Sequence, residues 1–381
     1  MSVMLDGRPV TSSAQQCASA FAHAVDREAR FPAETVAALR SERALSLLVP
    51  QELGGAGATV CEAAEGVFRI ARHCASSAMV LAMHHLQVAC LARHGRTPAL
   101  RSYLSSVASE QLLLASATSE AGVGGALRTS RCALEREGGR FRLQKQASVI
   151  SYGAFADGVL ATCRRGPDAP PSDQVLVVCA PPGLELTQVG EWDTLGMRGT
   201  VSPGFLLAAE GPEDYVVPDP FGDIASQTMM PVSHVLWSHV WLGIAAAAMS
   251  KARTFVQHQA RKNPGTTPGG AGSLAELAVA YQQMEALVRD ATASLEASWS
   301  TRTEGLRSVV SFNSLKVAAS TLVVEIVTRA LAICGMAGYA ERSPFSLGRQ
   351  LRDAHGAALM VNNERILADN AQLLLVSKEA R

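Results

Sequence analysis

The order of apolar and polar positions divides the chain into three parts, the first of which is helical. Residues 13 to 110 carry apolar residues at helical spacing, as in AETVAALRSERAL, and the Ala-rich segment at 61 to 95 has almost no strand character. The segment LVPQELGGAG is rich in Pro and Gly, which predicts a loop between two helices. We therefore predict a helical domain over residues 1–111.

From about residue 112 the pattern changes to short runs that are typical of strands. RCALEREGGRFRLQKQASVI contains two alternating runs around a Gly-Gly turn, and DGVLATCRR, QVLVVCAP, LELTQVGEW and GFLLAAEG follow it. These runs predict a β-domain over residues 112–215. Long Ala- and Leu-rich segments then predict helices at 235–260, 273–299, 309–335 and 354–377, so that residues 216–381 form a second helical domain.

Composition excludes several functional classes. The chain has 34 Lys and Arg against 34 Asp and Glu, so we expect no general attraction to nucleic acid or to an anionic membrane. The eight cysteines are scattered without a CxxC pair, which argues against a metal site and against a disulfide framework. The first residues lack the pattern of a secretory signal, and we expect no stretch to reach the roughly 20 apolar residues of a membrane span. A cytoplasmic location is the expectation.

Four motifs then occur in a fixed order: FPAETVAALRSERALSLLVPQELGGAG, ATSEAGVGGALRTS, DTLGMRGTVSPGF and CGMAGYAERSPFSLGRQLRD. Together they resemble motifs of the acyl-CoA dehydrogenase flavoprotein family over nearly the whole chain. The resemblance implies a mainly α fold with a helical N-terminal domain, a central β-barrel domain and a C-terminal four-helix bundle. It also implies bound FAD and a homodimer or homotetramer.

The same resemblance assigns residues to the flavin. A loop of small residues lets backbone N–H groups approach the isoalloxazine ring, and here it would comprise Ala117, Thr118, Ser119, Gly124 and Gly125. Ser151 matches the family's hydroxyl residue near the N5 edge of the flavin. Val149 replaces a family aromatic residue and leaves the face of the flavin less covered.

Three further residues would contact the rest of the cofactor. Arg261 aligns with the family arginine that reaches the pyrophosphate of a neighbouring subunit's FAD, and Gly335 and Gly338 would approach its adenine half. A solvated arginine at a helix end, and glycines that only cap a helix, are the alternatives.

The segment RDAHGAALMVNNERIL departs from the family at the residue that matters most. Family dehydrogenation removes a weakly acidic α-proton from an acyl thioester, which requires a positioned base and donors for the developing enolate. Val361 stands where most members have the catalytic Glu, and Ser233, followed by His234, stands where other members have it. The backbone N–H at Val361 survives the replacement, so part of the oxyanion site can persist.

Other side chains are candidates for the missing base. Glu364 lies three residues beyond Val361, and His234 and His239 lie on a Trp-rich helix; each also has an ordinary structural interpretation as a surface or core residue. His84 and His85 are open to the same two interpretations. The residues assigned to substrate contact are His84, Ser233 and Asn362.

The sequence therefore predicts an FAD-dependent oxidoreductase that acts on an acyl or aminoacyl thioester, carried by CoA or by a carrier protein. The reaction would be α,β-dehydrogenation with a non-standard base. The first alternative is a flavin monooxygenase, a hydroxylase or N-oxygenase on the same fold, because such relatives typically lack the Glu. The second alternative is a relative that binds a thioester without catalysis.

Overall fold

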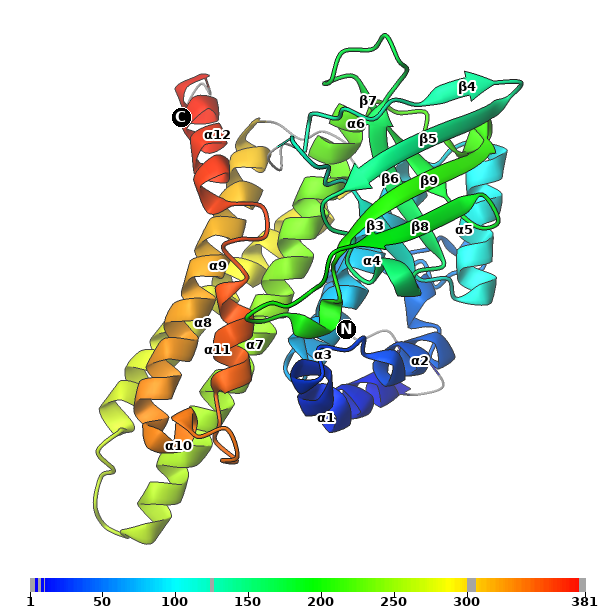
Figure 1. Ribbon diagram of the computed structural model, residues 1–381. Helices are drawn as coiled ribbons and strands as arrows, with labels where there is room; N and C mark the ends of the chain where they lie inside the picture. The colour runs from blue at the N-terminus through cyan, green and yellow to red at the C-terminus, as the bar shows by residue number, and fades with distance from the viewer. Residues whose placement is uncertain (1–3, 6–7, 10, 124–126, 300–305, 377–381) are drawn as a thin grey trace.

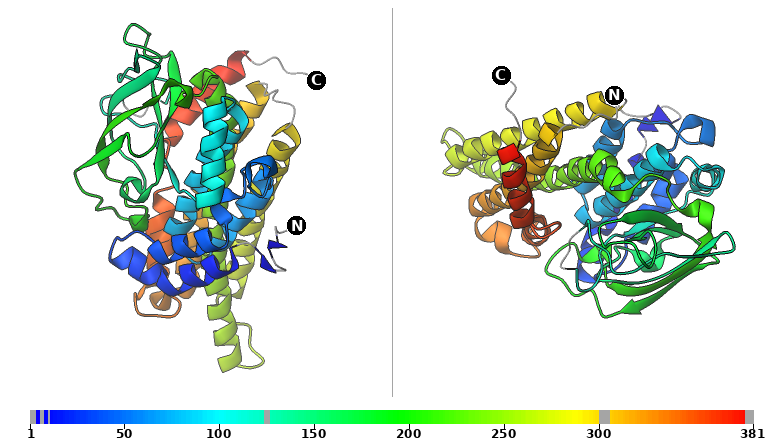
Figure 2. Two further views of the ribbon diagram at one scale, coloured as in Figure 1. Left: turned by 90° about the vertical axis from the view of Figure 1, so that its right-hand side faces the viewer. Right: turned by 90° about the horizontal axis from the view of Figure 1, so that it is seen from above.

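The computed structural model describes residues 4–5, 8–9, 11–123, 127–299 and 306–376. Helices at the N-terminus, strands in the middle and long helices at the C-terminus follow one another along the chain, which confirms the predicted fold class. Figure 1 shows the long helices α7, α8 and α9 on one side of the molecule, with the strands and the N-terminal helices on the other. The two views of Figure 2 show the same separation between the bundle and the sheets.

The N-terminal part contains five helices: α1 (Ser12–Arg27), α2 (Ala33–Ser41), α3 (Val60–Ala71), α4 (Ala75–His94) and α5 (Pro98–Glu110). The N-terminus of α3 has a capping box, in which Thr59 and Glu62 each bond the other's backbone N–H. Helix α4 is buried on almost every side because it packs against α3, α5, α7 and a strand of the middle domain. A short pair of strands, β1 (Met4–Leu5) and β2 (Arg8–Pro9), precedes α1.

Two sheets make up the middle part. The first has the order β3-β6-β7 and contains β3 (Leu114–Ala117), β6 (Gly158–Arg164) and β7 (Gln174–Cys179). The second has the order β4-β5-β9-β8 and contains β4 (Glu135–Glu137), β5 (Arg140–Ala147), β9 (Gly204–Pro212) and β8 (Leu184–Val189). Side chains of β5 alternate between exposed and buried, as expected of a strand with one face on the core. The predicted hairpin is confirmed, and both Gly138 and Gly139 have positive φ in its turn.

The C-terminal part begins with α6 (Phe221–Ile224) and a π-helical turn, η6 (Ala225–Met229), which lead into α7 (Met230–Lys262). Helices α8 (Ala271–Trp299) and α9 (Leu306–Cys334) follow, then α10 (Met336–Tyr339), α11 (Gly348–His355) and α12 (Asn363–Val376). Helix α7 crosses α3 so closely that a Cβ on Gly243 would lie 2.4 Å from that of Ala71. The single helix predicted over 354–377 is wrong, because the chain leaves helical geometry between α11 and α12 and Val361 has φ +50°.

Three helical segments are long and apolar enough to cross a membrane by length and composition alone: Ala75–His94, Phe221–Lys262 and Ser308–Cys334. The expectation that no such stretch exists is therefore wrong. Their most apolar windows are 89%, 83% and 39% buried inside the protein, respectively. Burial of the first two is the environment of core helices, whereas most residues of the α9 window are half-buried or are exposed polar residues.

Candidate active site

The segment that follows β3, where the sequence predicts a flavin loop, is held by one buried carboxylate. Glu120 is 7% exposed and accepts hydrogen bonds from the Ser130 hydroxyl at 2.6 Å and from the backbone N–H of Cys132 at 2.8 Å. The ammonium of Lys145, itself buried, lies 3.8 Å from the same carboxylate. A buried carboxylate that accepts several hydrogen bonds fixes both ends of the segment.

Within this segment, Ala117 is buried at the end of β3, and Thr118 and Ser119 are half-buried. The Ser119 hydroxyl donates to the carbonyl of Val149 at 2.9 Å and accepts from its N–H at 3.2 Å, so the loop is tied to the segment that contains Ser151. Gly124 and Gly125 lie outside the described residues.

Ser151 ends a short chain of hydroxyl groups. The Ser202 hydroxyl donates to Ser151 Oγ at 3.0 Å, and the Thr200 hydroxyl lies 2.9 Å from Ser202. Ser151 is half-buried, and no described residue accepts its own proton. Val149, two residues earlier, is 43% exposed. Ser151 therefore keeps a positioned donor for a ligand beside an uncovered apolar side chain.

Two of the motifs that the sequence singled out contact each other across the domains. The backbone N–H of Met197 donates to Asp353 Oδ1 at 2.7 Å, and a Cβ on Gly196 would lie 2.2 Å from the carbonyl oxygen of Arg352. The Arg352 guanidinium also forms an ion pair with Asp26 of α1. We call these contacts of Gly196, Met197, Arg352, Asp353 and Asp26 the interdomain junction.

Burial is the main influence on the pKa of Asp353. The carboxyl is 5% exposed, and burial raises its pKa from 3.8 to about 6, against the lowering effect of the Met197 N–H and of nearby arginines. This carboxylate faces the junction and is therefore a structural group.

The turn between α11 and α12 explains the unusual residues at 361 to 363. Val361 has φ +50°, which is strained for a β-branched residue. The ammonium of Lys316 on α9 donates to the Val361 carbonyl at 2.7 Å and to Asn363 Oδ1 at 2.7 Å. The Asn363 amide also bonds Ser320, and the Asn362 side chain accepts from the N–H of Glu364 at 2.8 Å as a cap of α12.

Lys316 is the functional candidate that sequence reasoning missed. Its side chain is fully buried, with the Nζ atom 5.8 Å from the centre of the Trp241 ring, and burial lowers its pKa to about 8. The available signal was a single cation inside the apolar run FNSLKVAASTLVV, on a helix where every other buried polar residue is uncharged.

The structure does not bring Glu364 to a protected site. Its side chain is exposed at the first turn of α12, and its N–H is bonded by the Asn362 side chain. A surface position near a helix N-terminus is the ordinary place for a Glu.

The two histidines of α7 lie on different sides of that helix. His234 Nδ1 lies 3.1 Å from the carbonyl of Phe312 on α9, and burial, with the charge of Lys316, lowers its pKa to about 4. His239 Nδ1 bonds the carbonyl of Val235 within α7, and burial lowers its pKa as well. Both imidazoles are neutral near pH 7, and a pKa near 4 makes His234 a weak base.

His84 has a structural role. Its Nδ1 accepts from the Leu114 N–H at 3.0 Å and its Nε2 lies 2.6 Å from the Leu45 carbonyl, which fixes the neutral tautomer with the proton on Nε2. Burial lowers the pKa of His84 to about 4. His85 is also fully buried, and neither ring nitrogen has a partner among the described residues.

The remaining assigned residues are spread over the bundle. The Ser233 hydroxyl bonds the carbonyl of Met230 within α7, and Arg261 is exposed at the end of that helix. Gly335, with φ +54°, follows the last residue of α9, and a Cβ on Gly338 would lie 2.7 Å from the Cβ of Cys334. The two glycines fit the end of a helix and Arg261 fits a solvated side chain. Gly335 and Arg261 are exposed, whereas Gly338 is buried.

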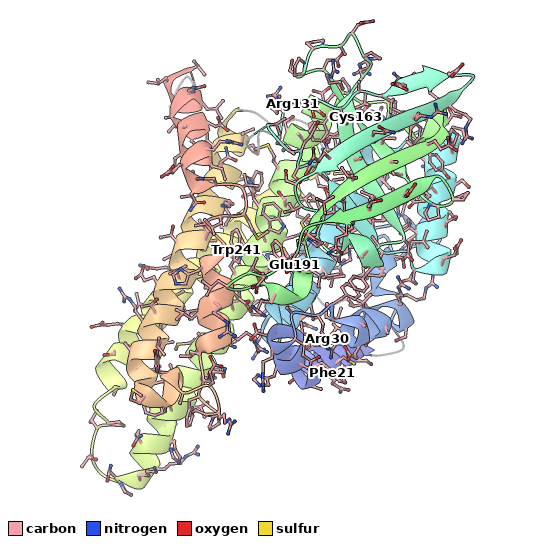
Figure 3. The ribbon with its side chains drawn as sticks, viewed as in Figure 1. Phe21, Arg30, Arg131, Cys163, Glu191 and Trp241 are labelled. Carbon is pink, nitrogen blue, oxygen red and sulfur yellow. The ribbon has the colours of Figure 1, made fainter. Side chains whose placement is uncertain are left out.

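A flavin fits the polar groups of this region. The loop after β8 crosses from the sheets to the bundle, where Gly196 meets α11, and Trp192 in this loop has a solvent-inaccessible Nε1 without an acceptor among the described residues. Figure 3 shows Glu191 of this loop and Trp241 of α7 at the boundary between the sheets and the bundle. An orphaned indole donor and the Ser151 hydroxyl are groups that a flavin's ring oxygens and nitrogens can satisfy.

A cavity of about 550 Å³ lies at the interdomain junction and does not include Ser151 or Val361. Its polar lining includes His23, Asp26, Arg27, Arg198, Glu341, Arg342 and Arg352. The cavity is thus a polar opening beside the junction and not the flavin region. Over the described ranges, His, Cys, Asp and Glu form no group of three that could hold a metal ion.

Comparison with known proteins agrees with this architecture. The chain is 27% identical to the amino sugar nitrososynthase DnmZ of Streptomyces peucetius over 351 residues, which cover 88% of this chain and 84% of that protein. It is 24% identical to the probable FMNH2-dependent monooxygenase SfnC of Pseudomonas putida, covering 86% and 85% of the two chains. The structure of FMN-bound TdsC from Paenibacillus sp. A11-2 superimposes with a TM-score of 0.83 over 97% of this chain and 98% of that chain, at 21% identity.

The family models that match describe the two helical parts. Residues 9–111 match the N-terminal domain of acyl-CoA dehydrogenases, and residues 224–361 match their C-terminal domain. The last matched residue is Val361, the position at which the expected carboxylate is missing. This chain belongs to the acyl-CoA dehydrogenase family.

Proposed function

We propose that the protein is a flavin-dependent monooxygenase, which hydroxylates or N-oxidises an organic substrate. The observation that carries the proposal is the α11–α12 turn. Val361 occupies the place of the family's base, its carbonyl is bonded to Lys316, and the nearest acidic residue along the chain, Glu364, is an exposed residue of α12. Abstraction of an α-proton from a thioester requires a base, whereas transfer of oxygen from a reduced flavin does not.

The relatives support the same choice. DnmZ is named as a nitrososynthase and SfnC as a probable FMNH2-dependent monooxygenase, and each is similar to this chain over most of its length. When bound, a reduced flavin supplies the two electrons with which O2 gives one oxygen atom to the substrate and one to water.

In this proposal the chain's own residues hold the ring and exclude water. Ser151 and Trp192 donate to the edge of the flavin, and the loop fixed by Glu120 covers it. The exposed Val149 leaves room above the ring for oxygen and substrate. FAD is the cofactor that the sequence predicts, and TdsC binds FMN, so the identity of the flavin is decided by titration.

A second candidate is α,β-dehydrogenation of an acyl or aminoacyl thioester, carried by CoA or by a carrier protein. The observation in its favour is His234, a neutral imidazole at the start of α7 beside the other family position of the base. Its low pKa makes it a poor acceptor for a weakly acidic proton, which is why this reaction is the second candidate.

One set of experiments separates the proposals. Purified protein is titrated with FMN and with FAD, and the flavin complex is then mixed with butyryl-CoA without oxygen. Bleaching of the flavin by butyryl-CoA supports dehydrogenation and contradicts our proposal. Incorporation of one atom from labelled O2 into a probe such as indole, with NADH and a flavin reductase, supports it. Protein that binds neither flavin is a non-catalytic relative, and both enzymatic proposals then fail.

A matched pair of variants tests the flavin contact. Ser151→Ala removes one hydrogen bond and lowers flavin affinity about fivefold, since one such bond contributes roughly 1 kcal/mol. Ser109→Ala, at an exposed serine on α5 whose hydroxyl bonds only Ser106, leaves the affinity unchanged. Equal affinities for the two variants contradict the placement of the flavin at Ser151.

We also propose that the protein is a homodimer or homotetramer. Met336 and Tyr339 of α10 are 76% and 72% exposed, and Leu367 of α12 is 53% exposed. Apolar surface of this kind is covered in stable oligomers. Light scattering during gel filtration measures the mass, and a monomer at micromolar concentration contradicts this proposal. A cytoplasmic location is a further proposal, which cell fractionation tests.

A further inference from the structure

Lys316 is a buried cation, and no carboxylate among the described residues offsets the free-energy cost of burying its charge. The residue is fully buried, and its ammonium contacts the Val361 carbonyl, the Asn363 amide oxygen and the face of Trp241. None of the ion pairs among the described residues includes it within 4.0 Å. A buried charge compensated only by neutral acceptors is expensive to maintain, and such groups concentrate at functional sites.

The contact with Val361 also fixes the direction of the next N–H group. The peptide between Val361 and Asn362 is planar and trans, so its carbonyl and its N–H point in opposite directions. Because the carbonyl points inward to Lys316 on α9, the Asn362 N–H points away from α9. Among the described residues, no backbone or side-chain acceptor bonds this N–H. Figure 1 shows the turn on the side of the bundle that faces the sheets.

We propose that Lys316 is a positioning residue of the active site: it holds the α11–α12 turn from inside, so that the Asn362 N–H is presented to a carbonyl-type oxygen of the bound ligand. This inference rests on the proposed function for the location of the ligand. The oxygen belongs either to the flavin ring or to the substrate, and the experiment separates the two.

Two physical effects make the arrangement suited to this role. The ammonium polarises the peptide whose carbonyl it binds, which strengthens the N–H at the other end as a donor. The bonds to Asn363 and Val361 also hold Val361 at its strained φ of +50°, a conformation that a valine does not adopt without support. Ligand binding therefore meets a donor that is already oriented.

The chain offers a matched control in Lys251. This lysine of α7 is also in the bundle, donates to the carbonyl of Ser346 and to Gln350 Oε1, and has a pKa lowered by burial to about 8. It has the same chemistry as Lys316 but bonds Ser346 before α11 and Gln350 within α11, and not the α11–α12 turn. Lys316→Met and Lys251→Met each remove one buried ammonium while keeping most of the volume.

The first measurement is hydrogen exchange of residues 356–363 in the flavin-free protein, which does not depend on the function. We expect Lys316→Met to speed exchange of this turn at least tenfold and Lys251→Met to leave it unchanged. In wild type, adding the ligand that supplies the oxygen slows exchange of this segment, and in Lys316→Met it does not. FMN or FAD alone gives the protection if the oxygen is on the flavin; addition of indole or butyryl-CoA is required if it is on the substrate.

The second measurement is affinity for the same probes, which we expect to fall about tenfold in Lys316→Met and to be partly restored in Lys316→Gln, which keeps a donor for the carbonyl. If Lys316→Met does not fold, Asn363→Ala, which leaves the lysine in place, gives a smaller change in the same direction. Unchanged exchange in the Lys316 and Asn363 variants overturns the proposal, and so does altered exchange with unchanged affinity for every probe. Wild type that binds no probe refutes the proposed function, while the exchange of the flavin-free turn still decides whether Lys316 holds it.

Discussion

The carboxyl of Asp353 gives the structure a pH dependence that can be isolated with one substitution. Asp353 is 5% exposed, and burial raises its pKa from 3.8 to about 6. Its Oδ1 accepts the N–H of Met197 at 2.7 Å, a bond that an asparagine can keep through its own carbonyl oxygen. Asp353→Asn therefore removes the ionisation while it preserves the contact across the interdomain junction.

The sign of this pH dependence follows from the number of protons that the folded and unfolded states bind. Between pH 3.8 and about pH 6 the folded state binds the Asp353 proton and the unfolded state has released it, so the free energy of unfolding falls as the pH rises. A shift of about two pKa units corresponds to roughly 3 kcal/mol, because one unit is worth about 1.4 kcal/mol. This stability is fully present below pH 3.8 and is lost by about pH 7. We expect the free energy of unfolding of Asp353→Asn, relative to that of wild type, to rise by up to that amount over the same pH range.

Urea unfolding of both proteins between pH 4 and pH 8 measures the difference. His84 and His234, with pKa values lowered to about 4, destabilise the folded state as the pH falls, but they are present in both proteins and cancel. Ser109→Ala, which changes no ionisable group, is the control and gives a flat difference. A difference between the Asp353 variant and wild type that stays flat, or falls, as the pH rises refutes the reasoning.

Three further predictions concern single residues. Gly196→Ala places a Cβ 2.2 Å from the Arg352 carbonyl oxygen and lowers the free energy of unfolding by roughly 2 kcal/mol or more, whereas Gly269→Ala, with open space around it, has little effect; urea unfolding of both checks this. His84→Leu leaves two buried backbone groups unpaired and costs roughly 2–5 kcal/mol, and a loss below 1 kcal/mol contradicts its structural role. Glu364→Gln leaves the rate of flavin reduction by butyryl-CoA, and the rate of oxygen transfer to indole, within about twofold, and a loss of orders of magnitude in the first rate instead identifies it as the base.

Local sequence was enough for most of the elements and for the family. The 3.6-residue spacing of apolar positions predicted the helices now seen as α2, α7, α8 and α9, and the Gly-Gly pair predicted the β4–β5 hairpin. The four motifs predicted the fold class because each depends on a few adjacent residues. Strand β3, with the sequence LASA, was missed because one leucine followed by three small residues carries no clear alternation.

The sequence also predicted that the family's carboxylate is absent, because Val361 and Ser233 stand where the resemblance places it. The sequence did not predict which contacts the residues at those positions make. The break between α11 and α12 lies in a segment with good helical spacing, and within it the Val361 carbonyl accepts a hydrogen bond from Lys316, 45 residues earlier. The junction joins Met197 to Asp353 across 156 residues.

The amino-acid sequence by itself determined the order of helices and strands, the family and the missing base, because each of these is written in residues that are neighbours along the chain. Only the tertiary structure decided that Glu364 is exposed, that burial lowers the pKa of His84 and His234, and that a buried lysine bonds the Val361 carbonyl. Those properties depend on which groups lose water and which acceptors face them after folding, and neither is set by local spacing.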